Sequence, residues 1–194
     1  DALGLGDAPA AVCACGALLS YLTDTQKCDL SHINTLDVFA GGKYMELDWA
    51  ARRNLELTEN LRTGEKRFSL LWVLDRTKTP MGGRLLRSWV ERPLLSPVAI
   101  RRRLSAVQEL VSDNVRRGEL LTALAGISDM QRLIGRAVYG SANGRDLQSL
   151  AECCAALPAL KEQLSGASSA LLREAGALAA LGAVRGDIAR AKCD

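Results

Sequence analysis

Apolar residues recur every three or four positions along most of the chain, the pattern of helices with one buried face. A first helix is expected over residues 9–26, largely buried around Leu18, Leu19 and Leu22. From residue 48 onward the pattern is helical throughout. Its first helix is expected from Trp49 to about residue 62, with Asp48 as its N-cap.

Two later helix starts combine a capping residue with a proline in the first helical position. These are Thr79-Pro80 and Ser96-Pro97. In the second of these helices, the apolar positions step by four, three and four residues. They are Ile100, Leu104, Val107 and Val111, and we expect them to form its buried line.

One strand signal interrupts the helices. Short alternating runs flank Gly41-Gly42, and two adjacent glycines can both take positive φ in a tight turn. The sequence therefore predicts a small β-hairpin near residues 36–47.

The end of the chain carries apolar residues at coiled-coil spacing. They are Ala177, Leu181, Val184, Ile188 and Ala191. This spacing predicts a long C-terminal helix that is still in register at the last residue, as if it continued further. The predicted fold class is therefore all-α: a multi-helix bundle with one hairpin and a long C-terminal helix.

Composition narrows the possible functions. The chain has 194 residues, 48% of them hydrophobic, and a net charge of +3, which does not by itself indicate a nucleic-acid binder. Six cysteines and a single histidine, His32, show no zinc-ligand spacing, so free thiols in a reducing, cytoplasmic setting are expected. No apolar run is long enough to predict a membrane-spanning helix.

Two motifs imitate known sites without their chemistry. Residues 63–68 resemble a linker between zinc fingers, but the paired Cys and His ligands are missing. Residues 140–144 are flanked by glycines, but Arg-Asp follows where a phosphate-binding loop needs Lys and Ser or Thr. We therefore expect no catalytic, cofactor-binding or metal-binding residues in this chain, and no enzyme activity of its own.

Clustered arginines leave two alternatives open. They lie at 101–103, 116–117, 132 and 136. They can form a solvated face that pairs with acidic residues such as Glu91, Glu109 and Asp129, or a patch that faces the phosphates of a nucleic acid. A helical protein–protein interaction module with no connection to DNA is a third alternative.

Several long motifs, in order, resemble the MutS family of bacterial DNA mismatch repair proteins. They are LDWAARRNLEL at 47–57, SLLWVLDRTKTPMGGRLLRSWVERPL at 69–94, and the segments 100–110, 127–137 and 143–147. Residues 16–26 resemble the helix that closes the family's connector domain. One departure is Ala51, where the family usually has Thr.

The resemblance implies a layout and a role. Residues 1–32 would form the C-terminal helix of the connector domain, and residues 33–194 the N-terminal half of the core, or lever, domain. The parent protein would be a homodimeric DNA-dependent ATPase that binds mismatched double-stranded DNA and recruits a MutL-like repair factor. Its ATP and Mg²⁺ site and its DNA clamp would lie outside this chain, which would link the two mechanically.

Overall fold

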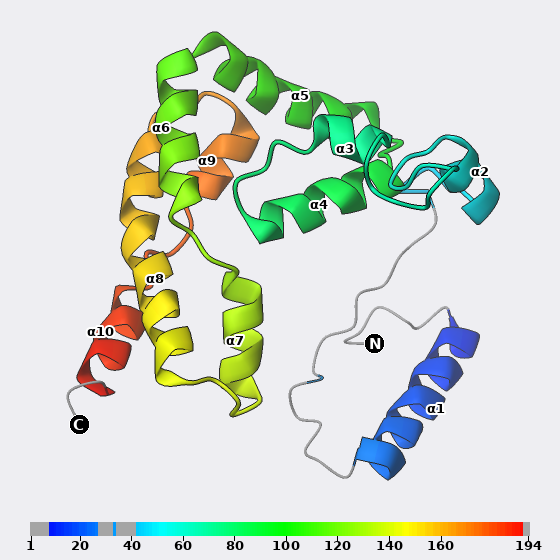
Figure 1. Ribbon diagram of the computed structural model, residues 1–194, viewed down its shortest axis with the longest axis horizontal. Coiled ribbons are helices and arrows are strands. Elements are labelled where there is room, and N and C mark those ends of the chain that lie inside the picture. Colours follow the sequence, from blue (N-terminus) through cyan, green and yellow to red (C-terminus); the bar gives the residue numbers. More distant parts are fainter. Residues whose placement is uncertain (1–7, 27–32, 34–41, 192–194) are drawn as a thin grey trace. The chain divides into compact units, whose positions relative to one another are not determined.

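The computed structural model describes residues 8–26, 33 and 42–191, and divides the chain into two compact units, residues 1–41 and 42–194 (Figure 1). In the first unit, α1 (Pro9–Gln26) occupies the expected residues. Its expected burial is wrong, because Leu18 and Leu19 are exposed. Apolar residues on several sides of a helix do not specify which side is covered.

The described residues of the second unit form helices joined by loops, with α8 at their centre. Its helices are α2 (Trp49–Asn54), α3 (Leu70–Leu74), α4 (Pro80–Glu91), α5 (Pro97–Ser112), α6 (Asn114–Ala125), α7 (Met130–Val138), α8 (Gly144–Leu164), α9 (Ala170–Gly176) and α10 (Gly182–Ala191). The longest, α8, packs against α6, α7, α9 and α10 (Figure 1). The all-α part of the predicted fold class therefore holds for this unit.

The main core lies between α8 and its neighbours. Leu150, Cys153 and Cys154 are buried on α8, and they are joined by Leu120 of α6 and by Ile127 of the α6–α7 connection. Burying these small and medium apolar side chains supplies the hydrophobic stabilisation of the α6–α8 region.

Capping residues set the helix starts as predicted. The Oδ1 atom of Asp48 accepts a hydrogen bond from Ala51 N at 2.6 Å, and Thr79 Oγ1 accepts one from Gly82 N at 3.1 Å. Ser96 caps α5 in the same way. Each cap satisfies an N–H group that lacks a partner inside the helix, which explains why α2, α4 and α5 begin where the sequence indicated.

The end of α2 differs from the prediction, because the helix stops at Asn54 instead of near residue 62. Glu56 has φ of +48°, a left-handed conformation that ends the helix. The following loop is organised by the buried Asn60, whose Nδ2 donates to Thr63 Oγ1 at 2.8 Å and to Arg67 O at 2.8 Å. The buried amide of this region is therefore Asn60, whereas Asn54 at the end of α2 is exposed.

The predicted β-hairpin near residues 36–47 is wrong. Residues 36–41 lie outside the described residues, and residues 43–45 pair elsewhere. Tyr44 forms an isolated antiparallel bridge with Leu94, with Met45 N donating to Pro93 O at 2.8 Å and Leu95 N to Lys43 O at 3.2 Å. The backbone of the predicted second strand is thus bonded to the segment after α4. The two glycines from which the hairpin was predicted carry no information about a partner so far along the chain.

The predicted long C-terminal helix is also wrong. Ala177 comes directly after α9, which ends at Gly176, and Val184, Ile188 and Ala191 lie on the 10-residue α10, which begins at Gly182. Leu181, between them, has φ of +49°, which breaks the helical path. Because α10 turns back to pack on α8, the heptad spacing does not extend as one continuous arm.

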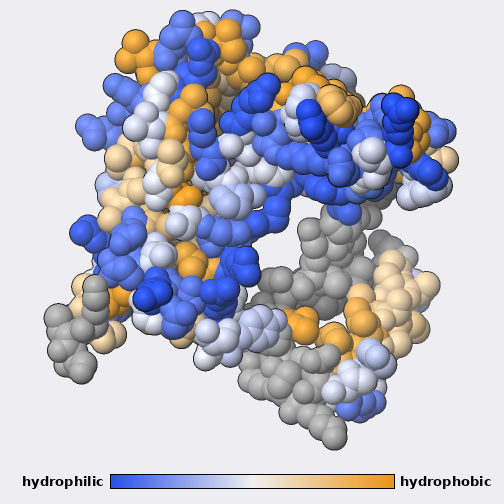
Figure 2. All heavy atoms as spheres, viewed as in Figure 1, coloured by the Kyte–Doolittle hydropathy of each residue, from blue (hydrophilic) through white to orange (hydrophobic). Residues whose placement is uncertain are grey.

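The expected buried line of α5 is exposed. Leu104 is 58% exposed, and Ile100, Val107 and Val111 are exposed as well, whereas Ala106 is buried. Figure 2 shows hydrophobic side chains reaching the surface along this part of the second unit. The spacing correctly predicted that these four apolar side chains share one face of α5. It did not reveal that a different face of α5 packs against the neighbouring helices.

A pair of leucine variants separates the packed residues from this exposed stripe. Leu71→Ala, at a site only 2% exposed, is expected to lower the free energy of unfolding of the 194-residue chain by about 2–5 kcal/mol. Leu104→Ala is expected to change it by no more than about 0.5 kcal/mol. Urea unfolding followed by circular dichroism measures both, and equal losses would contradict the assigned packing of α5.

Candidate coupling joints between the helices

Two of the three arginines at 101–103 contact partners within the chain. Arg102 on α5 pairs with Glu174 on α9. The Arg103 guanidinium lies over the ring of Trp89 on α4, 3.6 Å from its centroid, and burial there lowers the arginine's pKa. These two side chains therefore connect α5 to α4 and to α9.

The later arginines also bind partners in the chain. Arg116 Nη1 lies 3.1 Å from Glu109 Oε1, and Arg117 Nη1 donates to Leu110 O at 3.1 Å. Arg136 on α7 pairs with Asp146 on α8 at 2.8 Å. Of the two alternatives for the arginine clusters, these contacts favour pairing inside the protein over a surface facing phosphates.

Glu109 forms a joint between α5, α6 and α9. Its carboxylate accepts hydrogen bonds from Ser168 N at 2.8 Å and Ser169 N at 2.7 Å, and it pairs with Arg116 of α6. Ser169 is the N-cap of α9 and makes no side-chain capping bond, and Glu109 of α5 accepts from the backbone N–H groups at and before this cap. The two backbone N–H groups hold the pKa of Glu109 below its ordinary value.

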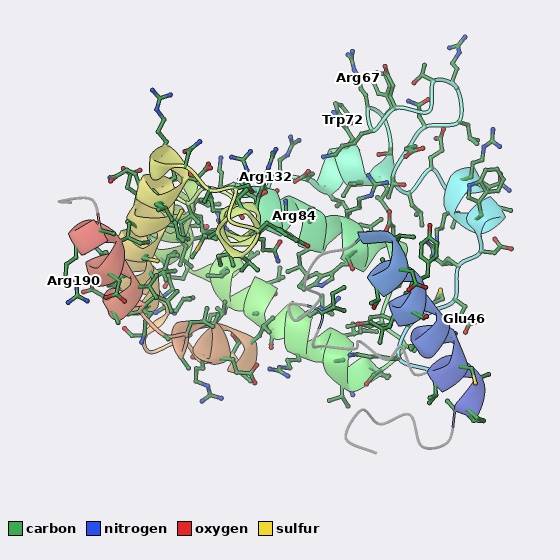
Figure 3. All side chains as sticks on the ribbon, turned by 90° about the horizontal axis from the view of Figure 1, so that it is seen from below. Glu46, Arg67, Trp72, Arg84, Arg132 and Arg190 are labelled. Atoms are coloured by element: carbon green, nitrogen blue, oxygen red, sulfur yellow. The ribbon has the colours of Figure 1, made fainter. Side chains whose placement is uncertain are left out.

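A second joint lies in residues 126–129, which connect α6 to α7 and which we call the 126–129 junction. Ile127 is buried, and Ser128 N donates to the Sγ atom of Cys153 on α8 at 3.3 Å. Asp129 caps α7 and also accepts two hydrogen bonds of 2.7 Å from Arg84 on α4, in the region labelled in Figure 3. Arg84 thus bonds α4 to this junction.

Arg84 is the joint residue that sequence reasoning missed. The helical pattern of α4 places it on the polar side of the helix, away from the apolar residues. Its guanidinium lowers the pKa of Asp129 to about 2, and the carboxylate in turn raises the pKa of Arg84. The partners are 45 residues apart, so spacing along the chain carries no signal of the contact.

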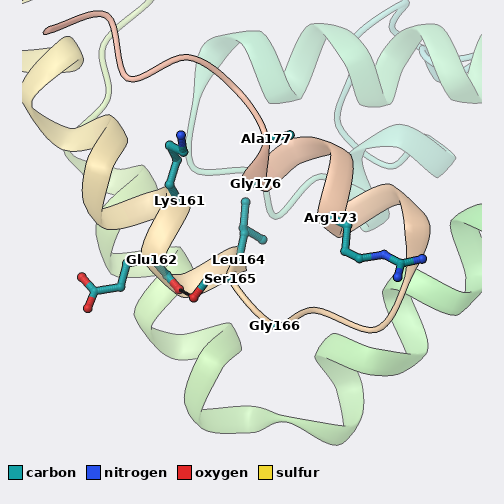
Figure 4. Close-up of a pocket in the computed structure, with 8 residues that line it drawn as sticks. All are labelled: Lys161, Glu162, Leu164, Ser165, Gly166, Arg173, Gly176 and Ala177. Atoms are coloured by element: carbon teal, nitrogen blue, oxygen red, sulfur yellow. Dashed lines mark hydrogen bonds between the residues drawn. The ribbon is translucent and has the colours of Figure 1, made fainter.

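A surface hollow of about 460 Å³ is lined by residues of α8, α9 and the loop between them, including Lys161 and Arg173. Figure 4 shows that the charged ends of these two side chains point in different directions, so they do not converge on one anion. Within the described residues there is no cluster of His, Cys, Asp and Glu that could hold a metal ion.

The structure also describes four of the six cysteines. Cys13, Cys15, Cys153 and Cys154 are free thiols, whereas His32, Cys28 and Cys193 lie outside the described residues. Among the helices in the described ranges, none combines the length and the apolar character that crossing a membrane requires.

Comparison with known proteins identifies the family. A family model described as MutS domain III matches residues 50–191. The chain belongs to the MutS family. It is 48% identical over 167 residues to the DNA mismatch repair protein MutS of Desulforamulus reducens, covering 86% of this chain and 19% of that protein.

Other relatives with the same name agree. MutS of Brevibacillus brevis is 47% identical over 161 residues, covering 83% of this chain and 19% of its own length. MutS of Synechococcus elongatus is 46% identical over 174 residues, covering 90% of this chain and 20% of its own length. The chain therefore spans about a fifth of the length of these relatives.

Family membership confirms the resemblance based on the ordered motifs, and it argues against an interaction module with no connection to DNA repair. The matched residues lie within the second compact unit, so this unit corresponds to the MutS core domain. The assignment of residues 1–32 to a connector domain stays a prediction.

The Asp129 joint predicts a pH dependence of stability. Its folded pKa is about 2 and its ordinary value 3.8, so its contribution is complete above about pH 4 and is lost as the pH falls toward about 2. Asp129→Asn is expected to lower the urea midpoint at neutral pH and to flatten its decline across that interval.

Asp187→Asn is the matched control, because Asp187 lies on α10 and pairs only with a neighbour on the same helix, Arg190, among the contacts found. Its midpoints are expected to follow those of the unmodified chain. If the Asp129→Asn midpoints also ran parallel to the unmodified chain down to pH 2, the assigned role of the Arg84–Asp129 pair would be wrong.

Thiol accessibility tests the placement of α8. Cys13 is exposed, whereas Cys153 is fully buried, and burial raises the pKa of Cys154. Brief treatment of the native chain with iodoacetamide is expected to modify Cys13 and to spare the two α8 cysteines until urea unfolds the chain. Peptide mass spectrometry measures this, and modification of Cys153 as fast as Cys13 would contradict the packing.

Proposed function

We propose that this chain is a lever segment of a longer DNA mismatch repair protein, which couples an ATPase site to a DNA clamp. The observation that carries the proposal is the match of residues 50–191 to MutS domain III. In this proposal ATP and Mg²⁺ bind elsewhere in the longer protein, and the chain itself carries out no catalysis. The longer protein would act as a homodimer on mismatched duplex DNA, together with a MutL-like factor.

The joints support a mechanical role. Close-packed helices do not bend continuously but shift between discrete arrangements. In this chain, α5 is tied to α4 by Arg103, to α9 by Arg102 and to both α6 and α9 by Glu109. A displacement applied to one of these helices therefore reaches the others through directional polar contacts.

The arrangement of α8 also supports this role. Cys153 bonds the 126–129 junction to α8, and Asp146 near the start of α8 holds Arg136 of α7. The α6–α8 region therefore offers a stiff body against which α4 and α5 can be displaced. In this proposal the DNA clamp is moved by this body instead of by one continuous heptad arm.

A chimera tests the coupling. Residues 50–191 would replace the matching segment of the Desulforamulus reducens MutS, and release of mismatched DNA on ATP addition would be measured by fluorescence anisotropy. Glu109→Gln weakens the joint between α5, α6 and α9, and it is expected to reduce the ATP-induced acceleration of release by about two- to thirtyfold. ATP hydrolysis and DNA binding measured separately should persist.

Glu119→Gln on the exposed side of α6 is the control, and it is expected to leave the coupling unchanged. The lever proposal would be wrong if Glu109→Gln and Glu119→Gln behaved alike. It would also be wrong if the unmodified chimera bound mismatched DNA and hydrolysed ATP without any response of release to ATP.

A further inference from the structure

Arg84 joins two parts of the second unit that otherwise pack on different neighbours. It lies on α4, which packs on α3, and it reaches the start of α7, which packs on α8. Its Nη1 and Nη2 atoms each donate to one oxygen of Asp129 at 2.7 Å, and Nη2 also donates to Gln131 Oε1 at 2.7 Å. The fork geometry makes the contact directional.

The contact is anchored firmly on one side. Asp129 follows the buried Ile127 and the Ser128–Cys153 hydrogen bond, so the carboxylate is fixed to the α8 body. On the other side, Arg84 is a long side chain whose surface is 51% exposed. Water and salt ions compete with an ion pair that is this exposed. The contact therefore stabilises the position of α4 only weakly, and it can open and close.

A second cationic side chain, that of Arg132, also stabilises the ionised form of Asp129. Arg132 lies one turn into α7, its N–H donates to Asp129 Oδ1 at 3.3 Å, and its charge also favours the ionised carboxylate. If Arg84 withdraws, Asp129 keeps a cationic neighbour and its capping role. Opening therefore does not leave an isolated charge, which keeps its cost low.

We propose that Arg84, Asp129 and Gln131 form a latch that closes α4 onto the 126–129 junction, and that its opening frees α4 from this junction while Arg103 still links α4 to α5. The idea that the latch regulates lever movement rests on the proposed function. The opening of the latch itself involves only residues of this chain, so it can be measured without ATP or DNA.

Hydrogen-exchange mass spectrometry of the 194-residue chain measures the opening. Arg84→Gln is expected to speed amide exchange about two- to fivefold in peptides from residues 77–91 and 126–138, the effect of losing one exposed ion pair. Peptides from α8, residues 144–164, should exchange as before. Asp129→Asn keeps a good capping residue and is expected to give the same local increase.

Two further variants complete the test. Arg84→Lys keeps the charge but loses the fork, and an intermediate increase is expected. The double variant Arg84→Gln with Asp129→Asn should exchange no faster than either single variant, because both remove one shared contact. Raising the salt concentration should speed exchange in the unmodified chain and leave the double variant unaffected.

Arg87→Gln is the matched control, since Arg87 lies one turn further along α4 and pairs with Glu59 and Glu91, away from α7. Unchanged exchange in Arg84→Gln, or an equal increase in Arg87→Gln, would overturn the latch. In the chimera, normal ATP coupling of Arg84→Gln despite faster local exchange would show that the latch exists but does not regulate the lever.

Discussion

Burial of one face of α8 is the constraint on which the second unit depends. Leu150, Cys153 and Cys154 lie on that face, and α6, α7, α9 and α10 all pack against this helix. The buried side chains are small or medium in size, which lets the surrounding helices approach closely. The polar joints can be directional because this packed body fixes one partner of each of them.

The division of labour between apolar and polar contacts gives the unit its mechanical character. Apolar packing is not directional, and it determines which helices stay together. The ion pairs and hydrogen bonds of Arg84, Arg102 and Glu109 are directional. They determine how the packed helices are oriented relative to one another. The exposed contacts of Arg84 and Arg102 can exchange partners at low cost, whereas the buried face of α8 cannot.

Sequence predicted the local features of the fold and missed those set by distant residues. The caps at Asp48, Thr79 and Ser96 depend on groups within one helical turn, so they could be identified directly. The hairpin failed because residues 43–45 pair with residues 93–95, and the long tail failed because of the left-handed backbone at Leu181. The pairing of the arginine at 116 with Glu109 was among the sequence alternatives, but the bond of Arg84 to Asp129 and those of Ser168 and Ser169 to Glu109 were missed, because these partners are 45 to 60 residues apart.

The double duty of Asp129 has an evolutionary consequence. One carboxylate serves as the N-cap of α7 and as the acceptor for Arg84. A change at residue 84 removes one of these roles, whereas most changes at residue 129 remove both. In descendants of this sequence, Arg84 should therefore be substituted before Asp129. Once Arg84 has changed, Asp129 needs only to cap α7, so asparagine or serine can replace it.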